Sequence, residues 1–155
     1  MKVEYINPFI KSTLNLFETM LNEKIVAGNP VVKKEPYPLF DVSAVIGLSG
    51  DVTGYVALSF SKSAGLKIAS RLIQENLKVV GQVMIDAIGE MANIVAGNAK
   101  QYIEGFNILI SLPNVVIGKA HKLHSTKESL SLLVPFQSQS GQFALEVAIK
   151  ENEKK

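Results

Sequence analysis

Apolar residues recur at every second position in two stretches of the chain, and this period of two restricts the fold more than any other feature. Successive side chains of a β-strand point to opposite faces, so the pattern is typical of strands that bury one face. The apolar positions are Phe40, Val42, Ala44, Ile46 and Leu48 in one stretch and Phe143, Leu145, Val147 and Ile149 in the other. Both stretches are therefore predicted to be strands that line the core.

Turn residues and helical periodicity place further elements around these two strands. Turn chemistry at 49–51 and at 137–141 predicts that neighbouring strands are joined as hairpins. The predicted strands are residues 31–33, 40–48, 54–60, 115–117, 130–134 and 143–149, and the predicted helices are about 8–23, from Ser61 or Ser63 to about 75, and about 79–104. Strands in adjacent hairpins, with helices before and between them, indicate the α+β class with a largely antiparallel sheet covered by helices.

Length and composition indicate one globular domain. The chain has 155 residues, of which 47% are hydrophobic and 19% are charged, and these values lie within the globular range. We expect a single domain over residues 1–150, followed by a charged tail at 151–155 that frays. The chain has no cysteine, which excludes disulfides, a thiol nucleophile and cysteine-ligated metals. The fold must therefore be stabilised by packing alone.

Charge and hydropathy restrict the possible partners. Sixteen Lys and Arg residues against fourteen Asp and Glu residues give a net charge of +2, which is too little for the basic surface of a nucleic-acid-binding protein. Neither a signal-peptide core nor a membrane-spanning apolar stretch is evident, so we expect a cytoplasmic protein without a membrane partner. His121 and His124 are interpreted as residues of a surface loop, not as metal ligands, because few carboxylates accompany them.

The predicted helix at 79–104 has two distinct faces. At about 100° per residue, its apolar residues gather on one face, which we expect to be buried: Val80, Val83, Met84, Ala87, Ile88, Met91 and Val95. On the opposite side, at spacings of four, three and four residues, lies a row made of Asp86, Glu90, Asn93 and Gly97. On spacing alone, this row is most simply the solvated face of a surface helix.

Two glycines on the polar side of this helix, Gly89 and Gly97, are unfavourable for helix formation. Each costs roughly 1 kcal/mol relative to alanine in an exposed helix interior. Glycine at these positions is therefore interpreted as leaving room for the close approach of another backbone.

The segment 86–99 begins with the residues DAIGEMAN, and it resembles the D-x3-E-x2-N helix of the CheC/CheX/FliY family of chemotaxis phosphatases. Downstream, the segment 112–118 resembles the proline and strand that follow this helix in the family. The order of elements also agrees over nearly the whole chain. Glu18 and Asn22 in the first helix lack the required spacing, and a single copy of the motif in a chain of this length indicates the CheX branch.

The resemblance implies that the chain hydrolyses the aspartyl phosphate of a CheY-like response regulator. It implies that Asn93 inserts into the regulator's active site and orients the attacking water, while Glu90 pairs with the regulator's active-site lysine. Asp86, Gly89 and Gly97 are expected to contribute to binding the regulator. Such chemistry suits these residues, because an acyl phosphate is already activated and its hydrolysis mainly requires a positioned water and charge stabilisation.

The resemblance also implies the other components of the reaction. Mg²⁺ is expected to be supplied by the bound regulator, and the chain is expected to need no cofactor of its own. We expect a homodimer joined partly through sheet edges, because a long exposed strand edge promotes aggregation unless another chain covers it. The alternative is a non-catalytic interaction module that binds a response regulator or a flagellar switch component through the same helix.

Overall fold

The structure is organised around one antiparallel sheet. The computed structural model describes residues 3–33, 40–118 and 130–153, and these hold eight strands in the order β1-β7-β8-β4-β3-β5, with β2 also paired to β7 and β6 to β3. The strands are β1 (Val26–Ala27), β2 (Val31–Lys33), β3 (Val42–Gly50), β4 (Val52–Phe60), β5 (Ile108–Ile110), β6 (Asn114–Ile117), β7 (Ser131–Ser138) and β8 (Gly141–Glu151). The hairpins β3–β4 and β7–β8 are those that the turn residues predict.

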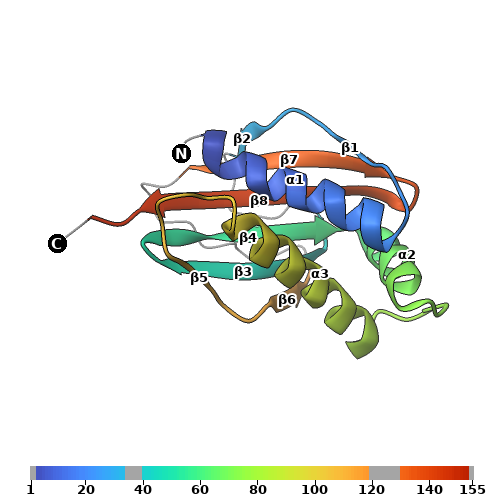
Figure 1. Ribbon diagram of the computed structural model, residues 1–155. Helices are drawn as coiled ribbons and strands as arrows, with labels where there is room; N and C mark the ends of the chain where they lie inside the picture. Colours follow the sequence, from blue (N-terminus) through green and yellow to red (C-terminus); the bar gives the residue numbers. More distant parts are fainter. Residues whose placement is uncertain (1–2, 34–39, 119–129, 154–155) are drawn as a thin grey trace.

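The helices form a layer against this sheet. They are α1 (Val3–Met20), α2 (Lys62–Ile73) and α3 (Gln82–Lys100). Figure 1 shows α1 and α3 on the same face of the sheet and α2 at one end of it. The hydroxyl of Ser12 in α1 donates a hydrogen bond to the backbone carbonyl of Val95 in α3 at 2.9 Å, which joins the two helices. The predicted α+β class, with helices covering an antiparallel sheet, is confirmed.

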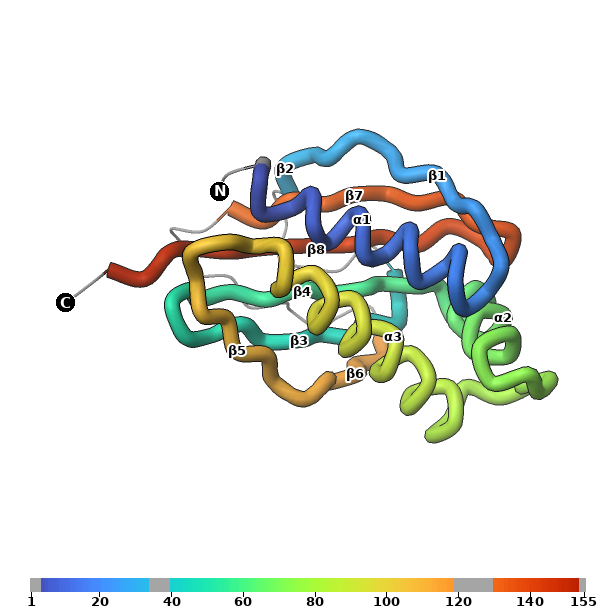
Figure 2. The backbone as a smooth tube through the Cα atoms, in the orientation of Figure 1, coloured from blue at the N-terminus to red at the C-terminus, as the bar shows by residue number. Residues whose placement is uncertain are grey.

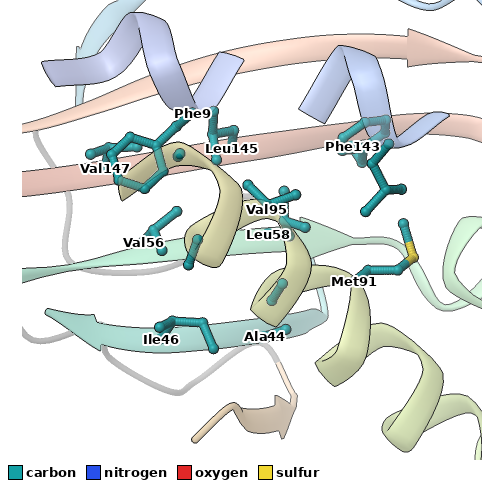
Figure 3. Close-up of a cluster of buried hydrophobic side chains, with 14 of the residues drawn as sticks. Phe9, Ala44, Ile46, Val56, Leu58, Met91, Val95, Phe143, Leu145 and Val147 are labelled. Atoms are coloured by element: carbon teal, nitrogen blue, oxygen red, sulfur yellow. The ribbon is translucent and has the colours of Figure 1, made fainter. Parts of the chain in front are cut away.

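The main core fills the space between the helical layer and the sheet. Phe9 of α1 and Met91 and Val95 of α3 pack over apolar side chains of the central strands (Figure 3). Those strand residues are Ala44, Ile46, Val56, Leu58, Leu145 and Val147. A fully buried aliphatic or aromatic side chain contributes about 1.5–3 kcal/mol by leaving water. The packing therefore fixes both the position and the rotation of α3 on the sheet.

Stacked aromatic rings extend this core toward one end of the sheet. The ring of Phe143 in β8 stacks on those of Phe17, Phe60 and Phe136, with centroid distances of 5.0, 5.2 and 5.0 Å. Such pairs add about 0.5–1.5 kcal/mol each beyond the burial of area. Because these rings come from α1, β4 and β7, the stack ties the first helix to three neighbouring strands.

The first helix begins before the position that the sequence predicts. Asn7 followed by Pro8 predicts a start at about residue 8, but α1 begins at Val3 and contains Pro8. Proline lacks a backbone N–H, so its presence costs one intrahelical hydrogen bond. Tyr5 and Ile6 are buried, and their contact with the core stabilises the additional turn.

The last strand continues into the predicted tail. β8 ends at Glu151, and the side chain of Asn152 accepts a hydrogen bond from Thr53 Oγ1 at 2.7 Å and donates one to the carbonyl of Gly50 at 2.8 Å. The expectation that the chain frays from residue 151 is therefore wrong for residues 151 and 152. The β3–β4 turn holds them, because it offers a hydroxyl donor and a carbonyl acceptor.

A buried carboxylate lies on the sheet face that points away from α1 and α3. Glu146 of β8 forms an ion pair with Lys33 of β2 and accepts a hydrogen bond from the hydroxyl of Tyr55 in β4. Burial and, next, the charge of Glu146 raise the pKa of Tyr55 above its ordinary value of 10. The phenol therefore remains a protonated donor, and it satisfies a charge whose burial without partners would cost several kcal/mol.

We predict that Tyr55 makes the protein sensitive to alkaline pH. A tyrosine whose pKa is raised by folding contributes stability that is complete below its unfolded pKa of about 10 and is lost as the pH rises further. Tyr55→Phe should lower the free energy of unfolding at neutral pH by about 1–3 kcal/mol, because Glu146 loses a buried donor. The variant should also lose less stability than the wild type above pH 10. Urea unfolding of both proteins in the two pH ranges measures both effects.

Tyr55→Phe should still lose some stability above pH 10, because a second tyrosine titrates there. Burial and the neighbouring Glu151 raise the pKa of Tyr5 to about 12. If wild type and Tyr55→Phe lose stability with identical slopes above pH 10, Tyr55 is not the titrating group.

Candidate functional site

The buried face of α3 determines which of its side chains reach the surface. Met84, Ile88, Met91 and Val95 are buried in the main core, as their spacing predicts. Val83 differs, because its side chain is 52% exposed. It lies in the first turn of α3, which runs past the edge of the sheet in Figure 1. The prediction that Val83 belongs to the core is therefore wrong.

Three polar residues share the outward side of α3, as the spacing predicts. Asp86 and Glu90 are exposed, and Asn93 is half-buried. Residues three or four apart on a helix are neighbours, with Cβ atoms about 5–6 Å apart, so the Glu90 carboxylate and the Asn93 amide are presented together. Asp86 is engaged within the helix, since Gln82 Nε2 donates a hydrogen bond to Asp86 Oδ1 at 2.7 Å.

Glu90 and Asn93 are both available to a molecule outside the chain. Neither side chain makes a hydrogen bond or an ion pair with another residue in the part of the chain that the structure describes. A carboxylate only accepts hydrogen bonds, whereas an amide both donates and accepts them. The pair can therefore bind a cationic donor and, beside it, hold a water molecule in a defined orientation.

Gly89 is buried, which differs from its expected place on the exposed polar side. A Cβ atom added to Gly89 would lie 3.4 Å from Cγ of Pro113 and 3.5 Å from Cγ2 of Val115. The groups that lie beside this glycine are thus side chains of the chain's own β5–β6 connection and of β6. The expected place of Gly89 on the exposed side is therefore wrong, because helical spacing does not reveal which segment packs beside α3. Its contribution to binding a partner stays a prediction.

Gly97 lies one helical turn after Asn93 and is half-buried. A Cβ atom added there would meet only Cδ1 of Ile110, at 3.9 Å, which is an ordinary contact distance. Among the described residues, no neighbour requires glycine at this position for packing. Because Gly97 has no side chain, the helix backbone beside Asn93 is accessible to a partner.

Glu90 and Asn93 lie on the outer side of a helix, away from the pocket between α1 and α3. That pocket is lined by Lys11, Ser12, Leu14, Asn15, Glu18, Asn98, Gln101 and Tyr102. Small ligands bind in concave sites that enclose most of their surface, whereas residues on the outer side of a helix are accessible to a large partner. The geometry therefore favours a macromolecule as the binding partner.

The described part of the chain shows neither a metal-binding cluster nor a helix that could span a membrane. Across residues 3–33, 40–118 and 130–153, no group of three or more His, Cys, Asp or Glu side chains is placed to hold a metal ion. His121 and His124 lie outside the described residues. Of the helices that the structure describes, none has the length and apolar character needed to cross a membrane.

Comparison with known proteins connects this helix with one family. Residues 42–137 match the family model of the chemotaxis phosphatase CheX, and this region contains all of α3. The chain is also similar to the CheY-P phosphatase CheX of Thermotoga maritima, with 26% identity over 153 residues, which cover 97% of this chain and 98% of the relative.

Solved structures agree with the sequence comparisons. A chemotaxis protein CheX from Desulfovibrio desulfuricans has a TM-score of 0.86 and 27% identity, and the match covers 96% of this chain and 100% of that one. A second match is to a CheX–CheY–BeF₃–Mg²⁺ complex from Borrelia burgdorferi, with a TM-score of 0.83 and 28% identity over 97% of this chain and 100% of the matched chain. The fold and the order of its elements are therefore those of CheX structures.

We predict that Gly97→Ala stabilises the protein. Alanine is favoured over glycine in a helix by about 1 kcal/mol, and the added Cβ atom meets only Ile110 at a normal distance. Gly89→Ala should gain less, because its Cβ atom would contact the ring of Pro113. Urea unfolding of the two variants measures the difference. A loss of stability in Gly97→Ala would show that the chain's own packing requires this glycine.

Proposed function

The chain belongs to the CheX family of chemotaxis phosphatases, and we propose that it hydrolyses the aspartyl phosphate of a CheY-like response regulator. The observation that carries this proposal is the pair of unpartnered side chains, Glu90 and Asn93, on the outward side of α3. The similarity to a CheY-P phosphatase over nearly the whole chain supports the reaction. The similarity to a CheX chain in complex with CheY supports the partner.

In this proposal, Asn93 orients the attacking water. The phosphoryl group of an acyl phosphate leaves readily, so the main requirement is a water molecule held in line with the phosphorus. The amide of Asn93 can accept a hydrogen bond from this water through its oxygen and donate one to the phosphoryl group through its nitrogen. Because an amide does not titrate, the orientation is maintained over a wide pH range.

Glu90 fixes the position of the regulator in the same proposal. Its carboxylate lies one turn before Asn93 on an exposed surface, where it can pair with a lysine of the regulator. An ion pair that is desolvated by docking has shorter, stronger hydrogen bonds than a neutral pair. The contact would therefore hold the regulator in the register that places Asn93 at the phosphoryl group.

The remaining residues of the site support docking. Asp86 adds a second negative charge one turn before Glu90, where Gln82 restrains it. Gly97, one turn after Asn93, has no side chain that would hold a partner away from the helix. Gly89 acts indirectly, because it allows Pro113 to pack against α3. Mg²⁺ enters with the regulator as part of the substrate, in agreement with the Mg²⁺ in the complex of the relative from Borrelia burgdorferi, and the chain supplies no cofactor.

We predict that Asn93→Ala and Glu90→Ala fail in different steps. Asn93→Ala should lower the single-turnover rate at saturating protein while leaving affinity for the regulator nearly unchanged, because the lost interaction belongs to the transition state. Glu90→Ala should weaken binding by about 2–5 kcal/mol, since one partner of a buried charge pair is removed, and the remaining binding should depend less on salt. Titration against a beryllofluoride-loaded regulator, followed by single-turnover dephosphorylation, separates the two effects.

Asn98→Ala is the matched control, because Asn98 is an exposed asparagine of the same helix that lines the pocket facing α1. It should retain both affinity and rate. A normal single-turnover rate in Asn93→Ala would contradict the role of the amide and favour a non-catalytic interaction module.

The proposal includes a homodimer that uses one edge of the sheet. The long strand β8 is paired on both sides and offers no free edge. The outer strands β1 and β2 instead carry three exposed valines, Val26, Val31 and Val32. A second copy of the chain that covers them would remove apolar surface and an unpaired edge from water. α3 lies toward the other edge of the sheet (Figure 1) and would remain accessible.

We predict that sedimentation velocity at micromolar concentration shows a dimer. Val32→Asp should shift the protein toward monomer, because a charge would be buried in the interface. Leu109→Asp, on the opposite edge of the sheet, should leave the dimer intact. A wild-type protein that sediments only as a monomer would contradict the proposed dimer.

A further inference from the structure

Leu112 is the most exposed large apolar side chain in the part of the chain that the structure describes, with 87% of its surface accessible. Single exposed apolar residues are common on protein surfaces. Leu112 differs because the residues on both sides of it are held in place. It also lies in the connection between β5 and β6, which packs beside α3.

Hydrogen bonds fix the residue before Leu112. The backbone N–H of Ser111 donates to the carbonyl of Gly47 at 2.9 Å, and the N–H of Gly47 donates to Ser111 Oγ at 2.8 Å. The Ser111 hydroxyl in turn donates to the carbonyl of Leu112 at 2.9 Å. On the other side, Pro113 packs against Gly89 of α3. The side chain of Leu112 is therefore presented from a constrained backbone.

The β5–β6 connection runs alongside α3, and Figure 2 shows it on one side of this helix. At one end, Ile110 Cδ1 lies 3.9 Å from a Cβ atom added to Gly97. At the other end, Pro113 Cγ lies 3.4 Å from a Cβ atom added to Gly89. The eight-residue step from Gly89 to Gly97 covers about 12 Å of helix, and the three-residue step from Ile110 to Pro113 can cover up to about 10 Å. The two segments therefore match in length and run in opposite directions.

Asn93 lies midway between the two glycines, four residues from each. Since the connection follows the helix over this interval, Leu112 is near the turn of α3 that carries Asn93. Its side chain is directed to solvent, as its exposure shows. Leu112 is therefore within reach of a large partner that docks on Glu90 and Asn93.

We propose that Leu112 is an apolar anchor that the response regulator buries when its phosphorylated site docks on Glu90 and Asn93. This inference rests on the proposed function, because the partner is the same. Binding energy at protein interfaces is concentrated in a few well-packed residues near the centre, and an anchor on a constrained loop loses little conformational entropy on binding. Val83, exposed two turns before Glu90, extends the apolar surface at the far end of the site.

The test uses Leu112→Ala in the full chain, titrated against a CheY-like receiver loaded with beryllofluoride and Mg²⁺. We expect about tenfold weaker binding, the size typical of an anchor residue. The single-turnover dephosphorylation rate at saturating protein should stay within about twofold of wild type, because the anchor acts in docking and not in the chemical step. Affinity equal to wild type, or a lower saturating rate with unchanged affinity, would overturn the proposal.

Leu109→Ala provides the matched control. Leu109 is also exposed, at 53%, but its neighbours Ile108 and Ile110 point to the helical layer, so Leu109 is on the other sheet face. It should bind the receiver as wild type does. Thermal unfolding should be unchanged in both variants, since neither removes buried side chain. A change of oligomeric state in Leu112→Ala would show that a second copy covers Leu112 and would overturn the proposal.

Failure of the proposed phosphatase function and failure of the Leu112 anchor give results that can be told apart. Wild-type protein that binds the receiver but does not accelerate phosphate release contradicts the phosphatase. In that case weaker binding by Leu112→Ala still supports the anchor, and equal binding overturns it. Wild-type protein that does not bind the receiver overturns both.

Discussion

The burial of one face of α3 against the sheet is the constraint on which the rest of the structure depends. Met91 and Val95 occupy the space above the central strands (Figure 3), and Ser12 of α1 fixes the helix from the side. A helix held in this way cannot rotate without exposing these side chains, at about 1.5–3 kcal/mol for each. The outward direction of Glu90 and Asn93 therefore follows from residues that have no contact with a substrate.

The two glycines of α3 differ in what packs beside them. Glycine is unfavourable in a helix at both positions. A Cβ atom added to Gly89 would touch Pro113 at 3.4 Å, whereas one added to Gly97 would lie 3.9 Å from its only neighbour, Ile110. Through the contact with Pro113, the β5–β6 connection is held beside the helix and contributes to the surface around Asn93. The proposed site thus combines a helix with an adjacent loop.

The sequence predicts the elements with strong periodicity and misses those that depend on contacts distant in the chain. Alternation over 40–48 and 143–149 and helical spacing around Met91 correspond to β3, β8 and α3. β1 and β5 have two and three residues, too few for a period, and they form by pairing with β7 and β3. Val83 has core spacing but lies beyond the sheet.

The same distinction applies to the site. The row of Asp86, Glu90 and Asn93 follows from residue spacing, because a helix places positions three and four apart on one side. The burial of Gly89 and the exposure of Leu112 could not be predicted. They depend on how the β5–β6 connection is held by Ser111 and Gly47, which are 64 residues apart in the chain.

The central claim is that this surface performs a reaction and does not only bind. Phosphate release from an excess of phosphorylated CheY-like receiver, measured with a small amount of the wild-type chain, tests it most directly. We expect release to be faster than the receiver's spontaneous rate, with several molecules of phosphate released for each molecule of the chain. Stable binding to the phosphorylated receiver with release at the spontaneous rate would contradict the account.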